Sequence, residues 1–428
     1  MQIFGSFFLL TYYISNIIFQ QNYKEDFMHN TQKITNDLTW IGASDRRLAL
    51  FENVYPIPLG ISYNSYLLKD EKNVLFDTVD SAVSKQFFEN LKFALNGENL
   101  DYVIIHHMEP DHCAEISNLL RIYPQVKIIC NVQIKKMLEN FFSLNIPNEQ
   151  YILVKDGETL NIGHHKLHFM AAPMVHWPEV MVTYDETEKT LFSADAFGTF
   201  GALNGNIFAD EVCFERDYLA EARRYYTNIV GKYGVQVQAL LNKAKNIEIK
   251  RICPLHGHIW RTNPAKFIEL YQKWANYEAE EKGVVIAYGS IYGNTQNAAE
   301  ILASKLAQKG VKNIKMYDVS VTHPSYIIAE AFRVNTLVFA AVTYNSGIFV
   351  NMDNLLRDIT AHNLQNRIIA TIDNGTWAAI AGKLMREELS KLKNCLFIEP
   401  NISIKSALTE NQENELEELA TAIAANIV

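Results

Sequence analysis

The sequence predicts an α/β protein of two domains, in which a four-layer α/β sandwich is followed by a doubly wound parallel sheet. Three observations lead to this fold class. Residues 34–282 combine short β-rich runs with interleaved helical segments. Residues 284–425 alternate strictly between strand-like and helix-like segments, as doubly wound sheets do. With 428 residues, the chain is long enough for each domain to bury its own core.

Hydrophobic periodicity predicts the elements of the first domain. The strand-like runs, expected to pair two by two, cover residues 64–68, 73–78, 180–184 and 190–193. The last two are expected to form a hairpin around Asp185 and Glu186. Helical periodicity covers residues 84–95, 113–122, 133–142 and 217–243. Such a succession predicts a sandwich whose loops meet at one edge of the sheets.

The second domain begins with residues 284–289, a continuous apolar run of the kind that is buried in a parallel sheet. Further strands are expected at residues 314–317, 336–341, 367–372 and 396–398. One helix is expected to open after the first strand, and the others at residues 326–332, 351–361, 378–392 and 411–425. Five strands and five helices in this rhythm predict a doubly wound five-stranded sheet.

Metal-capable side chains are concentrated directly after the apolar run at residues 102–105. His107, Glu109, Asp111 and His112 form the spacing His-x-Glu-x-Asp-His. A buried strand that ends in such a loop can hold a metal against a rigid sheet edge. A zinc hydrolase of the metallo-β-lactamase type would carry His where this chain has Glu109. An anionic oxygen in place of a neutral imidazole favours iron or manganese over zinc.

Three more candidate ligands follow apolar strands further along the chain, namely His176, Asp195 and His256. The complete set contains four His, two Asp and one Glu. It is large enough for two metals that share one bridging carboxylate. One histidine after a strand is usually a structural residue, but seven ligands in this order are hard to produce by accident.

Four other histidines are expected to be structural or to support the ligands: His106, His165, His168 and His258. On an extended chain His106 alternates away from His107 and should point off the site. Cys113 could be read as a thiolate ligand, but we interpret it as a small packed thiol because the oxygen and nitrogen set is complete without it.

Composition narrows the possible partners and compartments. The net charge of −9 gives no reason to expect a nucleic acid partner. The five cysteines are scattered without a Cys-x-x-Cys pair, which excludes a zinc ribbon, a rubredoxin-type iron site and an iron–sulfur cluster from the chain. An odd number of unpaired cysteines is typical of a reducing compartment, so we expect a cytoplasmic protein.

Residues 1–30 are predicted to be an N-terminal extension. The apolar stretch at residues 3–19 is shorter than the ~20 residues needed to span a bilayer. No Lys or Arg precedes it and no small-residue cleavage site follows, so it is a poor signal peptide. We interpret it as sequence before a true start at Met28, with a membrane anchor or an organelle-targeting segment as the alternative.

Three loops of the second domain suit a phosphate-bearing ligand. The first follows strand 284–289 and opens a helix, where N–H groups and the helix dipole favour an anion. The others leave the third and fourth strands, at the sheet edge where ligands bind. The expected contact residues are Ser290, Ile291, Tyr292, Gly293, Asn294, Thr295, Thr343, Tyr344, Asn345, Gly347, Asn374, Gly375, Thr376 and Trp377. The three loops resemble the flavodoxin loops that hold the phosphate and isoalloxazine of FMN, and the lack of a Gly-x-Gly-x-x-Gly fingerprint favours FMN over FAD or NAD.

From about residue 34 to residue 428 the chain resembles the flavodiiron proteins, which join a metallo-β-lactamase-like diiron domain to a flavodoxin-like domain. The motifs that carry the resemblance are His-x-Glu-x-Asp-His, His-Trp-Pro-Glu, Ser-Ala-Asp and Pro-x-His-Gly-x-Ile-Trp-Arg from Pro254 to Arg261. It implies a metallo-β-lactamase-like αββα sandwich in residues 31–281 and a flavodoxin-like doubly wound parallel sheet in residues 282–428. The third loop has Ala378 and Ala379 where the family pattern is richer in glycine.

The resemblance also implies two non-haem irons and FMN. One iron would be held by His107, Glu109, His176 and the bridging Asp195, and the other by Asp111, His112, Asp195 and His256. The implied reaction is the reduction of O2 to water, of NO to N2O, or of both. Four electrons for O2 would come from two ferrous irons and a reduced flavin, and ultimately from an external donor such as rubredoxin or a reductase. A head-to-tail homodimer, or a dimer of such dimers, would bring the FMN of one subunit to the irons of the other.

Two other functions are compatible with the fold class. One is a metallo-β-lactamase-type metal hydrolase with a fused flavodoxin-like domain, against which Glu109 argues. The other is a non-enzymatic flavin electron carrier, against which the complete set of seven ligands argues. Metal analysis separates the three, because a diiron enzyme should contain two irons per chain, a hydrolase zinc, and a carrier no metal.

Overall fold

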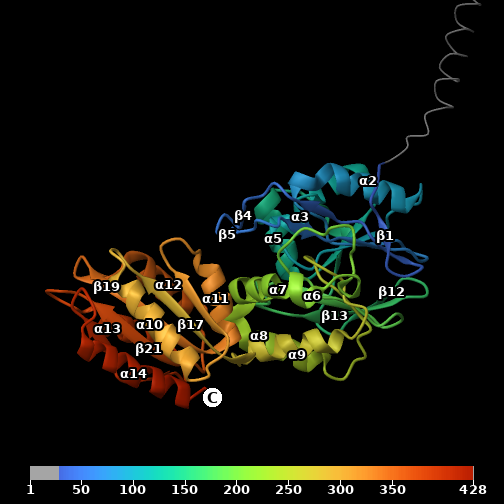
Figure 1. Cartoon of the computed structure of the whole chain (residues 1–428). Helices are drawn as coiled ribbons and strands as arrows, with labels where there is room; N and C mark the ends of the chain where they lie inside the picture. Colours follow the sequence, from blue (N-terminus) through green and yellow to red (C-terminus); the bar gives the residue numbers. More distant parts are fainter. Residues whose placement is uncertain (1–27, 428) are drawn as a thin grey trace, which may run out of the picture.

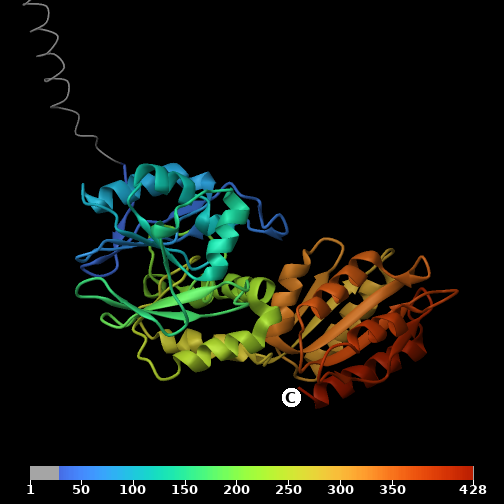
Figure 2. The ribbon, with the colours of Figure 1, turned by 180° about the vertical axis from the view of Figure 1, so that it is seen from behind.

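The computed structural model describes residues 28–427, and the predicted extension at residues 1–30 lies almost wholly outside them. The chain forms two α/β bodies that lie side by side in both views (Figures 1 and 2). Within the described residues no helix combines the length and the apolar character needed to cross a membrane.

The first body contains two facing sheets and two small strand pairs. The seven-stranded sheet consists, in spatial order, of β1 (Gln32–Lys33), β2 (Leu38–Trp40), β7 (Tyr66–Leu68), β8 (Val74–Phe76), β9 (Tyr102–Ile104), β10 (Lys127–Cys130) and β11 (Tyr151–Leu153). The five-stranded sheet consists of β12 (Thr159–Asn161), β13 (Lys166–Ala171), β14 (Met181–Asp185), β15 (Thr190–Phe192) and β16 (Arg251–Cys253). The small pairs are β3 (Ala43–Asp45) with β6 (Ile61–Tyr63), and β4 (Leu50–Phe51) with β5 (Tyr55–Pro56).

Side chains of the two sheets meet in one core. Phe76 of β8 stacks on Phe192 of β15 with ring centroids 3.7 Å apart, and both rings are buried. The expected strand pairs are confirmed, because β7 pairs with β8 and β14 with β15, both antiparallel. These short strands are buried at every position because one face of each packs on the other sheet and helices cover the opposite face.

Helices cover both outer faces of this sandwich, with α2 on one side and α8 and α9 on the other (Figure 1). The helices are α2 (Ser84–Leu95), α3 (Pro110–Cys113), α4 (Ile116–Ile122), α5 (Val132–Phe142), α6 (Phe214–Asp217), α7 (Leu219–Tyr225), α8 (Gly234–Ala244) and α9 (Pro264–Ala275). Shorter turns are η1 (Ser81–Val83), η2 (Asn148–Gln150), η3 (Ala209–Glu211), the π-helical η4 (Tyr226–Val230) and η5 (Gly231–Tyr233). The predicted four layers of the sandwich are present.

Two predicted helices are interrupted. The helix expected at residues 113–122 is divided between α3 and α4, because Glu115 leaves helical geometry (φ −89°, ψ 4°). Its carboxylate instead accepts a hydrogen bond of 2.7 Å from the side-chain amide of Asn118. The helix expected at residues 217–243 is divided into α7, η4, η5 and α8. There the Asn228 side chain donates to the carbonyl of Arg224 at 2.7 Å, and such a local bond competes with regular helical pairing.

The second body is a parallel sheet with helices on both faces, as predicted (Figure 2). In spatial order its strands are β18 (Ile314–Asp318), β17 (Glu281–Gly289), β19 (Val334–Tyr344), β21 (Ile368–Asn374) and β22 (Leu396–Phe397), and neighbours are parallel. The helices are α10 (Asn294–Gln308), α11 (Pro324–Arg333), α12 (Val350–Ala361), α13 (Ala381–Leu389) and α14 (Glu410–Ala425). β20 (Gly347–Ile348) pairs with the end of β19.

The fifth strand differs from the single strand expected at residues 396–398. It consists of β22 and of β23 (Ile402–Ile404), and both pieces pair in parallel with β21. Pro400 lies between the pieces. Proline has no N–H for the sheet ladder, so the strand is interrupted there and then resumes.

Buried polar contacts join the two bodies. Arg224 Nη1 donates to the hydroxyl of Ser325 in α11 at 3.3 Å, and the side-chain amide of Asn228 donates to the Ser325 carbonyl at 3.2 Å. The guanidinium of Arg224 lies between the rings of Phe200 and Tyr326, 4.5 and 4.4 Å from their centroids. These contacts bring α7 against α11 and explain how a short connection between α9 and β17 suffices to place one body beside the other.

Candidate functional site

The seven predicted metal ligands meet in one buried cluster at the edge of the two facing sheets. They come from four separate segments, which follow β9, β13, β15 and β16. All seven residues are at most 8% exposed: His107, Glu109, Asp111, His112, His176, Asp195 and His256. Their ligand atoms form two groups, within each of which all atoms lie less than 4.8 Å apart.

The first group contains His107, Glu109, His176 and Asp195. The Nε2 atom of His176 lies 3.1 Å from Glu109 Oε2 and 3.1 Å from Asp195 Oδ2. The Nε2 atoms of His107 and His176 are 3.2 Å apart. Two imidazole nitrogens and two carboxylate oxygens therefore face a common point.

The second group contains Asp111, His112 and His256. His256 Nε2 lies 3.2 Å from Asp111 Oδ2, and His112 Nε2 lies 3.1 Å from Asp195 Oδ1. Asp195 thus directs Oδ2 at the first group and Oδ1 at the second. This is the geometry of a carboxylate that bridges two metal ions.

Several atoms of this cluster lack a hydrogen-bond partner among residues 28–427. They are both carboxylate oxygens of Asp111, Oδ1 of Asp195, and Nε2 of His112 and His256. A buried polar atom without a partner costs ~1–3 kcal/mol. Metal coordination would satisfy all of these atoms, and their oxygen and imidazole chemistry suits iron. The residues present therefore fit a pair of iron ions.

The pKa shifts in the cluster are consistent with a site for cations. Burial raises the pKa of Asp111 to about 8, with further contributions from the charges of Glu109 and Asp195. Burial would lower the pKa of His176, but its hydrogen bonds to Asp195 and Glu109 outweigh burial and raise the pKa to about 9. Without metal, Asp111 and His176 thus hold protons, whereas the neighbouring histidines outweigh burial and lower the pKa of Glu109 and Asp195. Bound metal would take the place of the positive charge of these protons.

Two residues orient His107 and His256 through hydrogen bonds to their Nδ1 atoms. Glu179 accepts a hydrogen bond of 2.8 Å from Nδ1 of His107, and the carbonyl of Ser62 accepts one of 2.7 Å from Nδ1 of His256. Each bond leaves the opposite nitrogen, Nε2, free to bind metal. Glu179 was not predicted, although the His-Trp-Pro-Glu motif contains it.

The remaining histidines lie outside the ligand groups, as predicted. His106 points away from the cluster, with Nδ1 2.5 Å from Asp77 Oδ2 and Nε2 2.8 Å from the hydroxyl of Thr183. The side chain of His165 contacts Asp185. The Cys113 thiol is buried and donates to the carbonyl of Glu109 at 3.2 Å, so it packs behind the site.

Two further side chains, those of Tyr225 and Glu52, lie near the cluster although neither belongs to a recognised sequence motif. The ring of Tyr225 lies 5.5 Å from that of His256, and its hydroxyl has no partner in the described part of the chain. The loss of water around Glu52, followed by the charge of Glu109, raises the pKa of Glu52 to about 8, although part of this side chain reaches solvent. Both residues are distant from the ligands in sequence, so only folding brings them to the site.

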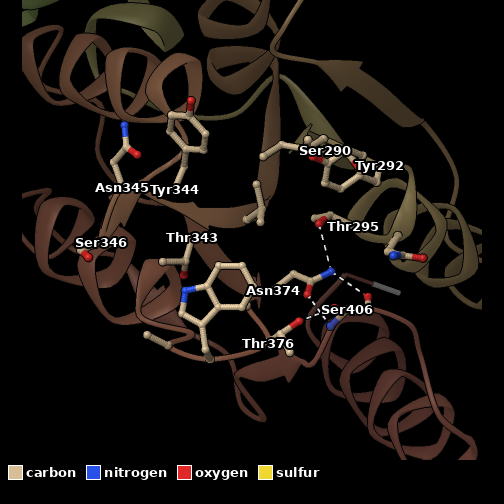
Figure 3. Close-up of a pocket in the computed structure, with 16 residues that line it drawn as sticks. Ser290, Tyr292, Thr295, Thr343, Tyr344, Asn345, Ser346, Asn374, Thr376 and Ser406 are labelled. Carbon is tan, nitrogen blue, oxygen red and sulfur yellow. Dashed lines mark hydrogen bonds between the residues drawn. The ribbon is translucent and has the colours of Figure 1, made fainter.

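A second site is a cavity of about 480 Å³ at the carboxyl edge of the parallel sheet (Figure 3). Its walls are Ser290, Ile291, Tyr292, Asn294, Thr295, Val342, Thr343, Tyr344, Asn345, Ser346, Asn374, Gly375, Thr376, Trp377, Ala378 and Ser406. Two predicted contact residues are absent from this wall. Gly293 makes the turn into α10 with φ +88°, and Gly347 pairs with Tyr344 in a hairpin.

The cavity suits FMN. No charged side chain lines it within the described residues, and the polar wall consists of hydroxyl and amide groups beside the N-terminus of α10. Figure 3 places Ser290 and Thr295 on one side and Thr343 and Tyr344 on the other. Helix N–H groups and hydroxyls can hold a phosphate, and the opposite side leaves room for an aromatic ring system.

Ser406 belongs to this wall but was not predicted. It follows β23, and its backbone N–H donates to Oδ1 of Asn374 at 2.9 Å. In return the Asn374 side-chain amide donates to the Ser406 carbonyl at 2.9 Å and to the Thr295 hydroxyl at 3.4 Å. These hydrogen bonds connect the segment that follows β23 with the predicted loops that contain Thr295 and Asn374.

Comparison with known proteins gives two family matches. Residues 61–257 match the ODP family beta lactamase, and residues 286–416 match flavodoxin. The first match contains all seven residues of the metal cluster. The second contains every residue of the cavity wall.

Relatives resemble the chain along most of its length. An anaerobic nitric oxide reductase flavorubredoxin from Shigella flexneri is 30% identical over 385 residues, which are 89% of this chain and 78% of that protein. The structure of rubredoxin oxygen:oxidoreductase from Desulfovibrio gigas has a TM-score of 0.85 at 27% identity and covers 93% of this chain and 98% of that one. A flavo di-iron protein from Thermotoga maritima has a TM-score of 0.84 at 27% identity, with the same coverage. Both the fold and the order of the two domains agree with those expected.

Proposed function

Because the chain belongs to the flavodiiron proteins, we propose that it reduces O2 to water, NO to N2O, or both, at a non-haem diiron site to which FMN relays electrons from an external donor. The observation that carries this proposal is the placement of Asp195. Its two oxygens lie 3.1 Å from His176 Nε2 and 3.1 Å from His112 Nε2, in two separate ligand groups. A simple electron carrier would not need such a bridge, and Glu109 in the place of a zinc-binding His argues against a two-zinc hydrolase.

In this proposal each ligand group holds one iron. His107, Glu109, His176 and Asp195 would hold the first, and Asp111, His112, Asp195 and His256 would hold the second. When bound, the irons and FMN supply the redox chemistry of gas reduction. The chain contributes a water-poor site and the hydroxyl of Tyr225 beside the cluster. Glu179 and the carbonyl of Ser62 accept hydrogen bonds from two of the candidate ligand histidines and orient them.

The cavity of the second domain is proposed to bind FMN. Its phosphate would lie at the N-terminus of α10 against Ser290, Asn294 and Thr295, where unpaired N–H groups favour an anion. The isoalloxazine ring would lie between the second and third loops. The proposed diiron domain spans residues 31–281, and the proposed FMN domain spans residues 282–428.

Electron transfer is proposed to occur between subunits of a head-to-tail homodimer or a dimer of such dimers. β17 starts at the junction with residue 281 and ends at residue 289, next to the cavity. A strand of this length spans about 25 Å, so the cavity lies far from the junction. Tyr292 and Trp377, which line the cavity, are 91% and 94% exposed. Exposed aromatic side chains of this kind are often covered by another subunit.

The external donor would be a rubredoxin or a reductase, because the relatives include enzymes named for rubredoxin. A cytoplasmic location is also part of the proposal. The proposed reaction needs an external donor, but it depends neither on which protein that donor is nor on the compartment.

Metal analysis with gas turnover tests the proposal. Purified protein should contain two irons and one FMN per chain. With a donor that has been reduced anaerobically, it should consume added O2 or, in the absence of O2, added NO. Zinc in place of iron together with hydrolase activity would support the hydrolase instead. Absence of metal with retained FMN would support the electron carrier.

A further inference from the structure

Thr343, on the wall of the FMN cavity, has an unusual set of hydrogen bonds. Its Oγ1 atom accepts the backbone N–H groups of Ile380 and Ala381, both at 3.0 Å. These residues begin α13, which has no side-chain cap of its own. The adjacent N–H of Gly382 is accepted by Asp373 at 3.0 Å. The start of α13 is therefore capped by side chains of β19 and β21.

These two bonds determine what Thr343 can still do. A hydroxyl has two acceptor lone pairs and one O–H donor, and two N–H groups occupy both lone pairs. Among residues 28–427 no acceptor is bonded to the Thr343 O–H, and the residue lines the cavity. Towards a cofactor in the cavity, Thr343 can act only as a donor.

Building on the proposed function, we propose that Thr343 donates a hydrogen bond to the pyrimidine side of the isoalloxazine and binds reduced FMN more tightly than oxidised FMN. The acceptor atoms of the ring system lie on that side, and reduction adds electron density there. Thr343 stands across the cavity from Thr295 in Figure 3, on the side away from the proposed phosphate position. The N–H groups of α13 polarise its hydroxyl, and a hydrogen bond to a more negative acceptor is stronger.

Substitution of Thr343 by valine tests this role, because valine keeps the shape and loses the hydroxyl. Affinities for oxidised and reduced FMN are measured on the purified full-length protein, and the FMN midpoint potential is measured by redox titration. We expect Thr343→Val to weaken binding of reduced FMN about tenfold more than that of oxidised FMN. Tenfold corresponds to a potential about 30 mV lower for a two-electron couple.

Two controls separate this effect from damage to α13. Thr343→Ser keeps the hydroxyl and should restore the wild-type potential. Thr371→Val removes another hydroxyl that contacts α13, where it accepts from Arg386 Nε at 2.9 Å. Thr371 does not line the cavity, so its variant should leave the potential unchanged.

The outcomes distinguish this inference from the proposed function. If wild-type protein binds no FMN, the proposed function itself is wrong. If FMN binds but Thr343→Val weakens both oxidation states equally, Thr343 contacts the ribityl chain or only supports the fold, and the inference is overturned. Loss of both states in Thr343→Val and in the milder Thr343→Cys would also contradict it.

Discussion

Glu179 Oε1 lies 2.8 Å from Nδ1 of His107 and also accepts the backbone N–H of Met108 at 2.9 Å. Glu179 is 1% exposed, so neither bond competes with water. The pair of bonds holds the imidazole of His107 with Nε2 towards Glu109 and Asp195. A residue that binds no metal thus sets the direction of a predicted ligand.

We expect Glu179→Ala to lower the affinity for ferrous iron by about 10–100-fold, as is typical when a residue that orients a ligand is removed. Glu179→Gln should have a smaller effect because its carbonyl oxygen can still accept. Iron titration of the metal-free protein measures both. Glu186→Gln alters a partly exposed carboxylate that contacts Lys166 and serves as the matched control. Equal iron affinity in Glu179→Ala and the wild type would show that His107 needs no such support.

Asp195→Asn should lower the iron content and abolish gas reduction while FMN remains bound. An amide is neutral and is a poor bridging ligand for two cations, and Asp195 faces both ligand groups. Elemental analysis and flavin absorbance on the same sample report the two cofactors separately. A variant with two irons and normal turnover would rule out the bridging role.

Thr295→Ala should weaken FMN binding by ~1.5–3 kcal/mol, the contribution of one hydrogen bond to a charged phosphate. Thr295 is 1% exposed in the first turn of α10. Fluorescence titration with FMN gives the affinity, and the iron content should stay unchanged. Thr421→Ala removes an exposed hydroxyl that is bonded within α14 and should have no effect. Unaltered affinity in Thr295→Ala would place the phosphate elsewhere.

Two inactive variants should complement each other if subunits share catalysis. His107→Ala disables the metal site, and Thr295→Ala, assayed without added FMN, depletes the flavin site. A mixed dimer then has one interface with an intact FMN and an intact diiron site. We expect turnover to return after the two variants are mixed and allowed to exchange subunits. Exchange is followed with two affinity tags. Demonstrated exchange without activity would mean that electrons pass within one chain.

The ion pair of His165 and Asp185 should make stability depend on pH. Burial would lower the pKa of His165, but the hydrogen bond and charge of Asp185 outweigh burial, so the pKa is raised above its usual 6.5. A raised pKa stabilises the fold below about pH 6.5, and this contribution is lost as the pH rises through the folded-state value. The difference in unfolding free energy between wild type and His165→Asn should therefore shrink from pH 6 to pH 9. A constant difference in denaturant titrations would contradict this expectation.

The sequence was sufficient to locate both sites and to predict the order of the folds. Candidate ligands such as His107 and Asp195 could be recognised because each follows a buried strand, and strand ends meet at a sheet edge. The parallel sheet of the second domain was predictable for a similar reason, since its alternating apolar runs and helices are periodic patterns within short segments.

Contacts between distant segments decided the rest. The predicted helix at residues 217–243 is broken where the Asn228 side chain bonds to Arg224 and also to the carbonyl of Ser325, in a helix about 100 residues away. Ser406 reaches the FMN cavity only because β23 pairs with β21. Thr343 was predicted as a contact residue, but its restriction to donating depends on where α13 begins. Local patterns encode elements and candidate ligands, whereas hydrogen-bond partners are determined by the packing of the whole chain.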